Sequence, residues 1–308
     1  MLRRTLLAAS ASPRLRRLIT AAPATRAVVD SYVAGETAQD AVRVTRALRA
    51  AGLLVTLDYL GEDTKDQAQA AVVTDEYVHL LGKLGAERLT HGGAAEVSVK
   101  ATAVGLYLGA GTAAGNIARI CAAAAEAGTT VTLDAEEYAA VEPTLQIAAK
   151  LRAEHPDLGC VVQACLRRAE ADCRALAGHG VRVRLCKGAY SEPDTVAFTA
   201  RRDVDLSFGR CLRVLMNGPG YPMLATHDPR LIQITGSLAH LTGRAPDSFE
   251  YQMLYGIRPA EQRRLANAGA RMRVYVPYGG DWYAYLVRRL AERPANLAFF
   301  LRSLRPGT

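Results

Sequence analysis

Two adjacent arginines, Arg288 and Arg289, interrupt a helical apolar pattern near the end of the chain. Neighbouring helix positions point about 100° apart, so one solvent face does not hold both arginines among so many apolar neighbours. A guanidinium donates two parallel hydrogen bonds to a carboxylate and keeps its charge at any physiological pH. The pair therefore fits a grip on an anionic substrate. The alternative is a surface helix in which one arginine pairs with Glu292 and the other meets solvent.

Polar residues also recur where short β-rich runs end. Carboxylates, cations, an amide and an imidazole at such points can orient a ligand or exchange protons with it. In a barrel of alternating strands and helices, the carboxyl ends of the strands carry the chemistry, so we expect these side chains to converge. They are Asp58, Lys100, Asp134, Gln163, Arg184, Lys187, Thr226 and His227.

The elements that must position these residues alternate along the chain. Eight β-rich runs are separated by segments that mostly have room for a helix, which indicates a parallel sheet and predicts an α/β fold, a (β/α)8 barrel. We expect the barrel to occupy residues 51–308 and residues 1–50, which show no strand signal, to form a helical arm. The strands are expected at 53–59, 96–103, 129–134, 159–165, 181–186, 222–226, 248–253 and 272–276.

A glycine-rich segment suggests a different enzyme. Gly109, Gly111 and Ala114 match the G-x-G-x-x-A pattern of a dinucleotide-binding fold, and Asp134 lies 23 residues beyond Gly111, where a ribose-binding acid would sit. The alternative is therefore an NAD-dependent dehydrogenase. Two points disfavour it: the pattern belongs to the second unit of the alternation, and five residues separate it from the run 96–103.

The net charge of +8 is concentrated at the N-terminus, where six arginines and no acid precede Asp30. Such an arm fits a mitochondrial transit peptide, a basic amphipathic helix on an anionic membrane, or an ordinary solvated helix. A non-enzymatic membrane-surface or nucleic-acid-binding protein is the alternative class. The arm lacks the aromatic residues that RNA and DNA readers interleave with basic ones, which disfavours nucleic acid.

The apolar content and the cysteines indicate in which cellular compartment the protein works. Half of the residues are apolar, yet no uninterrupted apolar stretch is long enough for a spanning helix. The six cysteines form no C-x-x-C pair and have no histidine at metal-ligand spacing, so we expect a reducing compartment, no zinc and no disulfide framework.

Taken in order, several motifs resemble the proline dehydrogenase family. They are Ser98-Val-Lys100, Leu133-Asp134-Ala-Glu, Val162-Gln163-Ala, Arg184-Leu-Cys-Lys187-Gly-Ala-Tyr190, Ala225-Thr-His227, Phe249 to Arg258, Val274-Tyr-Val-Pro-Tyr-Gly279 and Tyr285-Leu-Val-Arg-Arg289. The resemblance implies a distorted (β/α)8 barrel that binds FAD without a Rossmann domain. It also implies oxidation of L-proline to Δ1-pyrroline-5-carboxylate, with the electrons passed to a membrane quinone.

The resemblance assigns roles to individual residues. Arg288 and Arg289 would grip the proline carboxylate, Lys100 would contact the substrate, and Tyr275 would pack on its ring. Asp134 would organise the site, either as a base or as an electrostatic orienter, and we expect it to form an ion pair with Lys100. Arg184 would stabilise the reduced flavin. The residues expected around FAD are Ala135, Gln163, Arg184, Lys187, Gly188, Ala189, Thr226 and His227.

The partners and location follow from the same resemblance. The chain has no long additional C-terminal domain, so it resembles the monofunctional form, which works with a separate pyrroline-5-carboxylate dehydrogenase. We expect a cytoplasmic protein, peripheral at the inner face of the membrane if its basic arm binds anionic lipid. A mitochondrial location is expected if that arm is a transit peptide.

Overall fold

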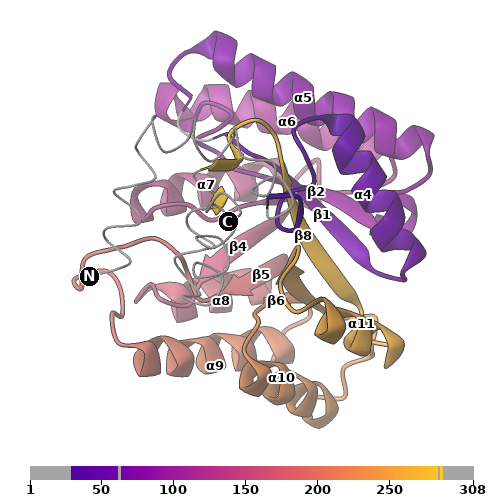
Figure 1. The fold of residues 1–308 in the computed structure, drawn as a ribbon. Coiled ribbons are helices and arrows are strands. Elements are labelled where there is room, and N and C mark those ends of the chain that lie inside the picture. The colour runs from indigo at the N-terminus through magenta and orange to yellow at the C-terminus, as the bar shows by residue number, and fades with distance from the viewer. Residues whose placement is uncertain (1–28, 62–63, 284, 287–308) are drawn as a thin grey trace, which may run out of the picture.

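The computed structural model describes residues 29–61, 64–283, 285 and 286, and in it eight parallel strands close into a barrel in chain order (Figure 1). The predicted (β/α)8 barrel is confirmed. The strands are β1 (Leu54–Tyr59), β2 (Ala95–Val99), β3 (Val131–Leu133), β4 (Gly159–Gln163), β5 (Arg182–Cys186), β6 (Tyr221–Ala225), β7 (Glu250–Leu254) and β8 (Met272–Tyr278).

Among the described residues, α4 precedes β1, and a helix follows each strand from β1 to β7 to cover the outside of the barrel (Figure 1). Two short 3-10 helices, η1 (His91–Gly93) and η2 (Leu106–Leu108), flank β2. The α-helices are α4 (Ala38–Ala50), α5 (Gln67–Ala86), α6 (Ala110–Glu126), α7 (Tyr138–Leu151), α8 (Ala169–Gly178), α9 (Arg201–Asn217), α10 (Pro229–Leu241) and α11 (Pro259–Asn267).

Local sequence signals explain where several helices begin. Thr37 and Asp40 form a reciprocal capping box at the start of α4, because each side chain accepts a hydrogen bond from the other's backbone N–H. Asp228 caps α10 by accepting from the Arg230 N–H, and Pro229 occupies the first turn, where a missing N–H costs nothing. The cap at Asp228 lies directly after the polar end of β6, so it also helps to shape the candidate site.

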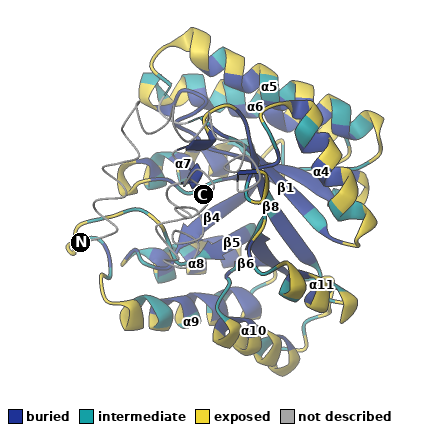
Figure 2. Cartoon of the chain, viewed as in Figure 1, coloured by how far each residue is buried: buried dark blue, intermediate teal, exposed yellow. Residues whose placement is uncertain are grey.

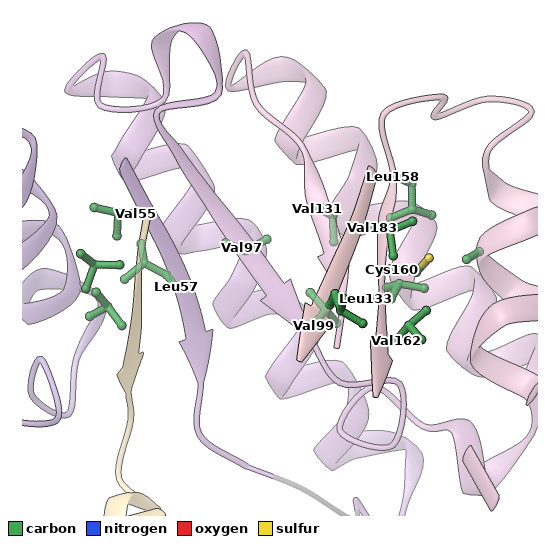
Figure 3. Packing of buried hydrophobic residues seen from close by; sticks show 14 of the residues in the cluster. Val55, Leu57, Val97, Val99, Val131, Leu133, Leu158, Cys160, Val162 and Val183 are labelled. Atoms are coloured by element: carbon green, nitrogen blue, oxygen red, sulfur yellow. The ribbon is translucent and has the colours of Figure 1, made fainter. Parts of the chain in front are cut away.

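The outward face of the barrel is apolar. Val55 and Leu57 of β1 and Val97 and Val99 of β2 are fully buried, and the same alternation continues into β3, β4 and β5 (Figure 3). The helices turn their buried sides to the strands and their exposed sides to solvent (Figure 2). Burying such a side chain contributes about 1.5–3 kcal/mol, so this layer between strands and helices holds the barrel closed.

The inward face is polar instead. Ser98 lies on β2 and Arg184 on β5, two strands that are not neighbours in the barrel, yet their side chains are 2.8 Å apart. Glu96 and Arg182 of the same two strands meet at 2.6 Å. These contacts can only cross the interior, so the strands project charged and hydroxyl groups into the barrel.

Barrel closure excludes the dinucleotide-binding alternative. Gly109 caps the N-terminus of α6 after the 3-10 turn η2, and α6 is the second crossover of a closed sheet. A dinucleotide-binding fold needs an open sheet with a switch in strand order. The glycine pattern is therefore a helix start with a coincidental spacing.

The structure bears in part on the predicted N-terminal helical arm and on the prediction that no helix spans a membrane. The helical arm at 1–50 is described only from residue 29, and its helix α4 packs against β1 and β8. The six N-terminal arginines lie outside the described residues. Within the described part, no helix has both the length and the apolarity to cross a membrane.

The packing of α10 on the barrel predicts a contrast between two leucines of that helix. Leu231 is 4% exposed and belongs to the main core, whereas Leu241 is 78% exposed. Leu231→Ala should lower the free energy of unfolding by about 2–5 kcal/mol, because it leaves a cavity. Leu241→Ala should change it by no more than about 0.5 kcal/mol. Urea unfolding followed by circular dichroism measures both, and equal losses would contradict the packing described.

Candidate functional site

The floor of the site is a layer of buried ion pairs in the amino-terminal half of the barrel. Glu96 accepts hydrogen bonds from Arg182 at 2.6 Å and from the Thr56 hydroxyl at 2.8 Å. Glu250 accepts from Arg273 at 2.6 Å, and Arg273 is 1% exposed. A buried charge is costly unless it is paired and hydrogen-bonded, and here each carboxylate meets an arginine. This floor closes the barrel beneath the polar strand ends.

Above the floor, three side chains from β2, β5 and β8 form a closed ring with Asp134, which directly follows β3. Arg184 Nη1 donates to the Ser98 hydroxyl at 2.8 Å, and that hydroxyl donates to Asp134 Oδ2 at 3.1 Å. The Tyr275 hydroxyl donates to the same Asp134 oxygen at 2.7 Å. The Arg184 guanidinium lies over the Tyr275 ring, 5.3 Å from its centre, which completes the ring. The structure thus brings together three residues expected at the site, Arg184, Asp134 and Tyr275.

The ring keeps Asp134 ionised. Burial acts to raise its pKa, but the charges of Arg184 and Lys100 and the hydrogen bonds from Tyr275 and the Ala135 N–H hold the pKa of Asp134 below its ordinary value. Burial and the neighbouring Asp134 raise the pKa of Tyr275 well above its ordinary value, so its hydroxyl keeps its proton and remains a donor. Asp134 is consequently a fixed negative charge, suited to orienting a cationic or polar group.

The expected ion pair between Lys100 and Asp134 is wrong. Lys100 Nζ instead lies 2.7 Å from both carboxylate oxygens of Asp58, at the end of β1, with both side chains buried. Asp58 lies opposite Ser98 in the register of β1 and β2, so Lys100 reaches back to it. The expected strand 96–103 is also too long: β2 ends at Val99, and Lys100 begins the turn.

Two nitrogen atoms of the Arg184 guanidinium have no hydrogen-bond partner among the described residues. Its side chain is buried, yet Nε and Nη2 have no hydrogen-bond partner among the described residues. Its Nη2 lies 3.9 Å from Glu96 of the floor, and its Nη1 lies 3.6 Å from Asp134, both beyond hydrogen-bonding distance. Buried donors without partners are rare, so they point to a group that binds here.

Gln163 and Glu136 link the ends of β3 and β4. Gln163 Nε2 donates to the Glu136 carbonyl at 2.8 Å, and Glu136 in turn accepts hydrogen bonds from the backbone N–H and the hydroxyl of Thr102. The amide orientation leaves Gln163 Oε1 facing Gly188, since a Cβ added to that glycine would lie 3.2 Å from it. Gln163 therefore presents an acceptor to any ligand at this edge.

The turn after β5 is constrained at Gly188. Its φ is +100°, and a Cβ there would lie 2.2 Å from Cys165 Sγ, so only glycine fits. The next residue, Ala189, is exposed. Lys187 Nζ lies 2.5 Å from Asp205 and 3.2 Å from Asp228, so its charge is shared by two carboxylates at the rim.

Thr226 and His227 directly follow β6. The Thr226 hydroxyl accepts from the Asp228 N–H at 3.1 Å. His227 Nε2 accepts from the Leu254 N–H at 3.0 Å, and the His227 carbonyl accepts from Arg258 at 2.7 Å. Because Nε2 is an acceptor, the neutral imidazole carries its proton on Nδ1 and has a donor there.

The arginine pair that we expect to bind the substrate carboxylate lies outside the part of the chain that the structure describes. Arg288, Arg289 and Glu292 lie outside the described residues. Residues 279–283, 285 and 286, which precede them, are described, and Trp282 and Leu286 are buried in a small apolar cluster after β8. Because the cluster also contains Leu60, which follows β1, it lies at the carboxyl ends of β1 and β8.

Three residues that the structure places in the site have no role in the prediction from the sequence. The sequence shows Asp58 as a polar strand end without an assigned role, and it shows Ser98 and Glu136 only as parts of motifs. Inward-facing alternation along β2 was a signal for Ser98. Glu136 lies in an irregular segment between β3 and α7, and its burial depends on the neighbouring loop.

Comparisons with known proteins agree with this geometry. A family model described as proline dehydrogenase matches residues 41–302. The chain is 39% identical to proline dehydrogenase 1 of Bacillus subtilis and 36% identical to proline dehydrogenase of Deinococcus radiodurans, in each case over 91% of both chains. A crystal structure of proline utilization A from Bdellovibrio bacteriovorus, inactivated by N-propargylglycine, matches with a TM-score of 0.81 and 26% identity. That match covers 87% of this chain and 33% of the other.

Glu136 predicts a pH-dependent stability. Burial raises its pKa from 4.5 to about 7, so the folded protein binds this proton more tightly than the unfolded chain does. Ionising Glu136 therefore lowers the free energy of unfolding. The loss is absent below pH 4.5, grows as the pH rises toward 7, and reaches its full size, on the order of 3 kcal/mol, above that pH. Glu136→Gln removes it, so the variant should gain stability relative to the parent between about pH 5 and pH 8.

Urea unfolding at several pH values measures the difference. Glu154→Gln, which changes an exposed carboxylate, is the matched control and should show no such trend. A constant difference between the Glu136→Gln variant and the parent at every pH would contradict the assignment.

Proposed function

Because the chain belongs to the proline dehydrogenase family, whose members oxidise proline as the first step of its breakdown, we propose that it converts L-proline to Δ1-pyrroline-5-carboxylate with bound FAD and a quinone acceptor. One observation carries the cofactor assignment. Arg184 is a buried guanidinium whose Nε and Nη2 have no hydrogen-bond partner among the described residues. An anionic ring is the group that such donors stabilise.

The surrounding residues fit FAD. Gly188 lets the backbone approach closely, and Gln163 offers an acceptor to a ring N–H. Thr226, Ala135 and Ala189 follow the carboxyl ends of β6, β3 and β5, where the cofactor would lie. Lys187 would contribute a cation to the pyrophosphate while it remains paired to Asp205 and Asp228. When bound, FAD would supply the acceptor for the hydride that leaves the carbon beside the proline nitrogen.

The protein's part in the reaction is to orient proline. Arg288 and Arg289 would hold the carboxylate, and the Tyr275 ring would form a wall beside the five-membered ring. The amine must lose its proton before its lone pair can form the C=N bond. Asp134 has a lowered pKa and is already hydrogen-bonded by Ser98 and Tyr275, so it would act as an electrostatic orienter and not as the base.

Lys100 would act as a donor whose charge is already balanced. Asp58 contacts it with both oxygens in a buried pair, so Lys100 adds little net charge to the site. Its role would be to fix the position of the substrate. Arg288 and Arg289 would then supply the positive charge that attracts the proline carboxylate.

The electrons would pass to a quinone in a second half-reaction, and the product to a separate pyrroline-5-carboxylate dehydrogenase. A membrane quinone requires the enzyme to approach the bilayer. The Arg-rich N-terminal segment, which contains no acid before Asp30, has the charge to bind an anionic membrane surface.

An anaerobic absorption spectrum tests the function. The purified protein should be yellow, and adding L-proline should bleach the flavin band, because hydride transfer reduces the cofactor. D-proline is the control for substrate specificity. A colourless protein that binds NAD, or a flavin that L-proline does not reduce, would contradict the proposal.

The arginine grip makes a separate prediction. Arg288→Lys and Arg289→Lys should each raise KM for proline about 10- to 100-fold with a smaller change in kcat. Each replaces a two-pronged contact with a point charge, and a hydrogen bond to a charged group is worth about 1.5–3 kcal/mol. Steady-state kinetics measure the effect. Arg263→Lys, at an exposed position of α11, is the matched control. An unchanged KM in both variants would rule out the grip.

A further inference from the structure

The Ser98 hydroxyl stands between the two charged groups of the ring. It accepts from Arg184 Nη1 at 2.8 Å and donates to Asp134 Oδ2 at 3.1 Å. Arg184 Nη1 and Asp134 Oδ1 are themselves 3.6 Å apart, an ion pair without a direct hydrogen bond. A neutral hydroxyl thus occupies the place where the guanidinium and the carboxylate would otherwise meet.

The position of this hydroxyl is rigid. Ser98 is fully buried, its backbone lies in register with both β1 and β3, and its carbonyl accepts from the Tyr77 hydroxyl at 2.8 Å. A serine held in this way cannot follow Arg184 if the arginine moves. It therefore sets where the guanidinium can rest.

The other carboxylate near Arg184 does not capture it. Glu96 lies 3.9 Å from Nη2, but its oxygens already accept from Arg182 and Thr56, and it lies 3.8 Å from Arg273. Asp134 is the acid within reach of a small rotation of Arg184, and Ser98 is the group in between. Arginine and carboxylate prefer a two-pronged contact, so the spacing seen here needs a cause.

We propose that Ser98 is a positioning residue that prevents Arg184 from pairing fully with Asp134, so that the charge and free donors of Arg184 remain available to the reduced flavin. The inference rests on the proposed function, because it takes FAD to be the ligand of Arg184. Without the hydroxyl, Arg184 closes onto Asp134, its charge is neutralised, and the negative charge of the reduced flavin is stabilised less.

The test uses the FAD-loaded protein and the variant Ser98→Ala. The equilibrium constant for two-electron reduction of the flavin, measured against a redox dye, should fall about 10-fold, which is a midpoint shift of about −30 mV. The rate of flavin reduction by proline should fall about 10- to 100-fold, while KM for proline should change less than about twofold. Ser207→Ala, a change of another buried serine on α9, is the matched control and should leave all three unchanged.

Two further variants separate positioning from a purely structural role. Ser98→Thr keeps the hydroxyl and should retain the parent's potential. Ser98→Ala combined with Arg184→Lys should cost no more than Arg184→Lys alone, because the serine acts through the arginine. Additive losses in the double variant, or an unchanged potential in Ser98→Ala, would overturn the inference.

Other outcomes are equally decisive. If the Ser98→Ala variant does not retain FAD, Ser98→Cys replaces it, because cysteine nearly keeps the volume of serine but is a weak hydrogen-bond donor. The same shift in the flavin midpoint potential is expected, and an unchanged potential in Ser98→Cys would overturn the inference. A parent protein that binds no flavin or fails to oxidise proline would instead refute the proposed function, and this result is distinct from a normal parent with an unaffected variant.

Discussion

The matching of charges inside the barrel is the constraint on which the rest of the structure depends. Most eightfold barrels fill their interior with branched apolar side chains, whereas this one projects ionised groups from most of its strands. Each must be paired, because an isolated charge in a dry interior is unstable. The acids that meet a cation in the barrel interior are Asp58, Glu96, Asp134 and Glu250, and the cations that they meet are Lys100, Arg182, Arg184 and Arg273.

This charge network separates the barrel into a structural half and a functional half. In the floor, the carboxylates and arginines touch directly and leave little to offer a ligand. Toward the carboxyl ends of the strands, Ser98 holds Arg184 and Asp134 apart, and in the described part of the chain Nε and Nη2 of the arginine have no hydrogen-bond partner. The same chemistry of arginine and carboxylate therefore stabilises one layer and prepares the other for binding.

The family and the geometry support each other in different ways. The relatives establish that the chain belongs among the proline dehydrogenases, and the barrel that they share puts its strand ends together. The structure of this chain adds individual contacts that family membership alone does not specify. They include the pairing of Lys100 with Asp58, the orientation of the Gln163 amide and the tautomer of His227.

The sequence by itself determined the alternation of strands and helices, the barrel, and the polar strand ends, because these follow from local periodicity and residue type. It also identified Asp134, Arg184 and Tyr275, which do meet. Only the tertiary structure decided that Lys100 chooses Asp58, that Ser98 separates Arg184 from Asp134, and that Glu136 is buried against Thr102. These contacts depend on strand register and on closure of the barrel, which join residues distant in the chain and leave no local signal.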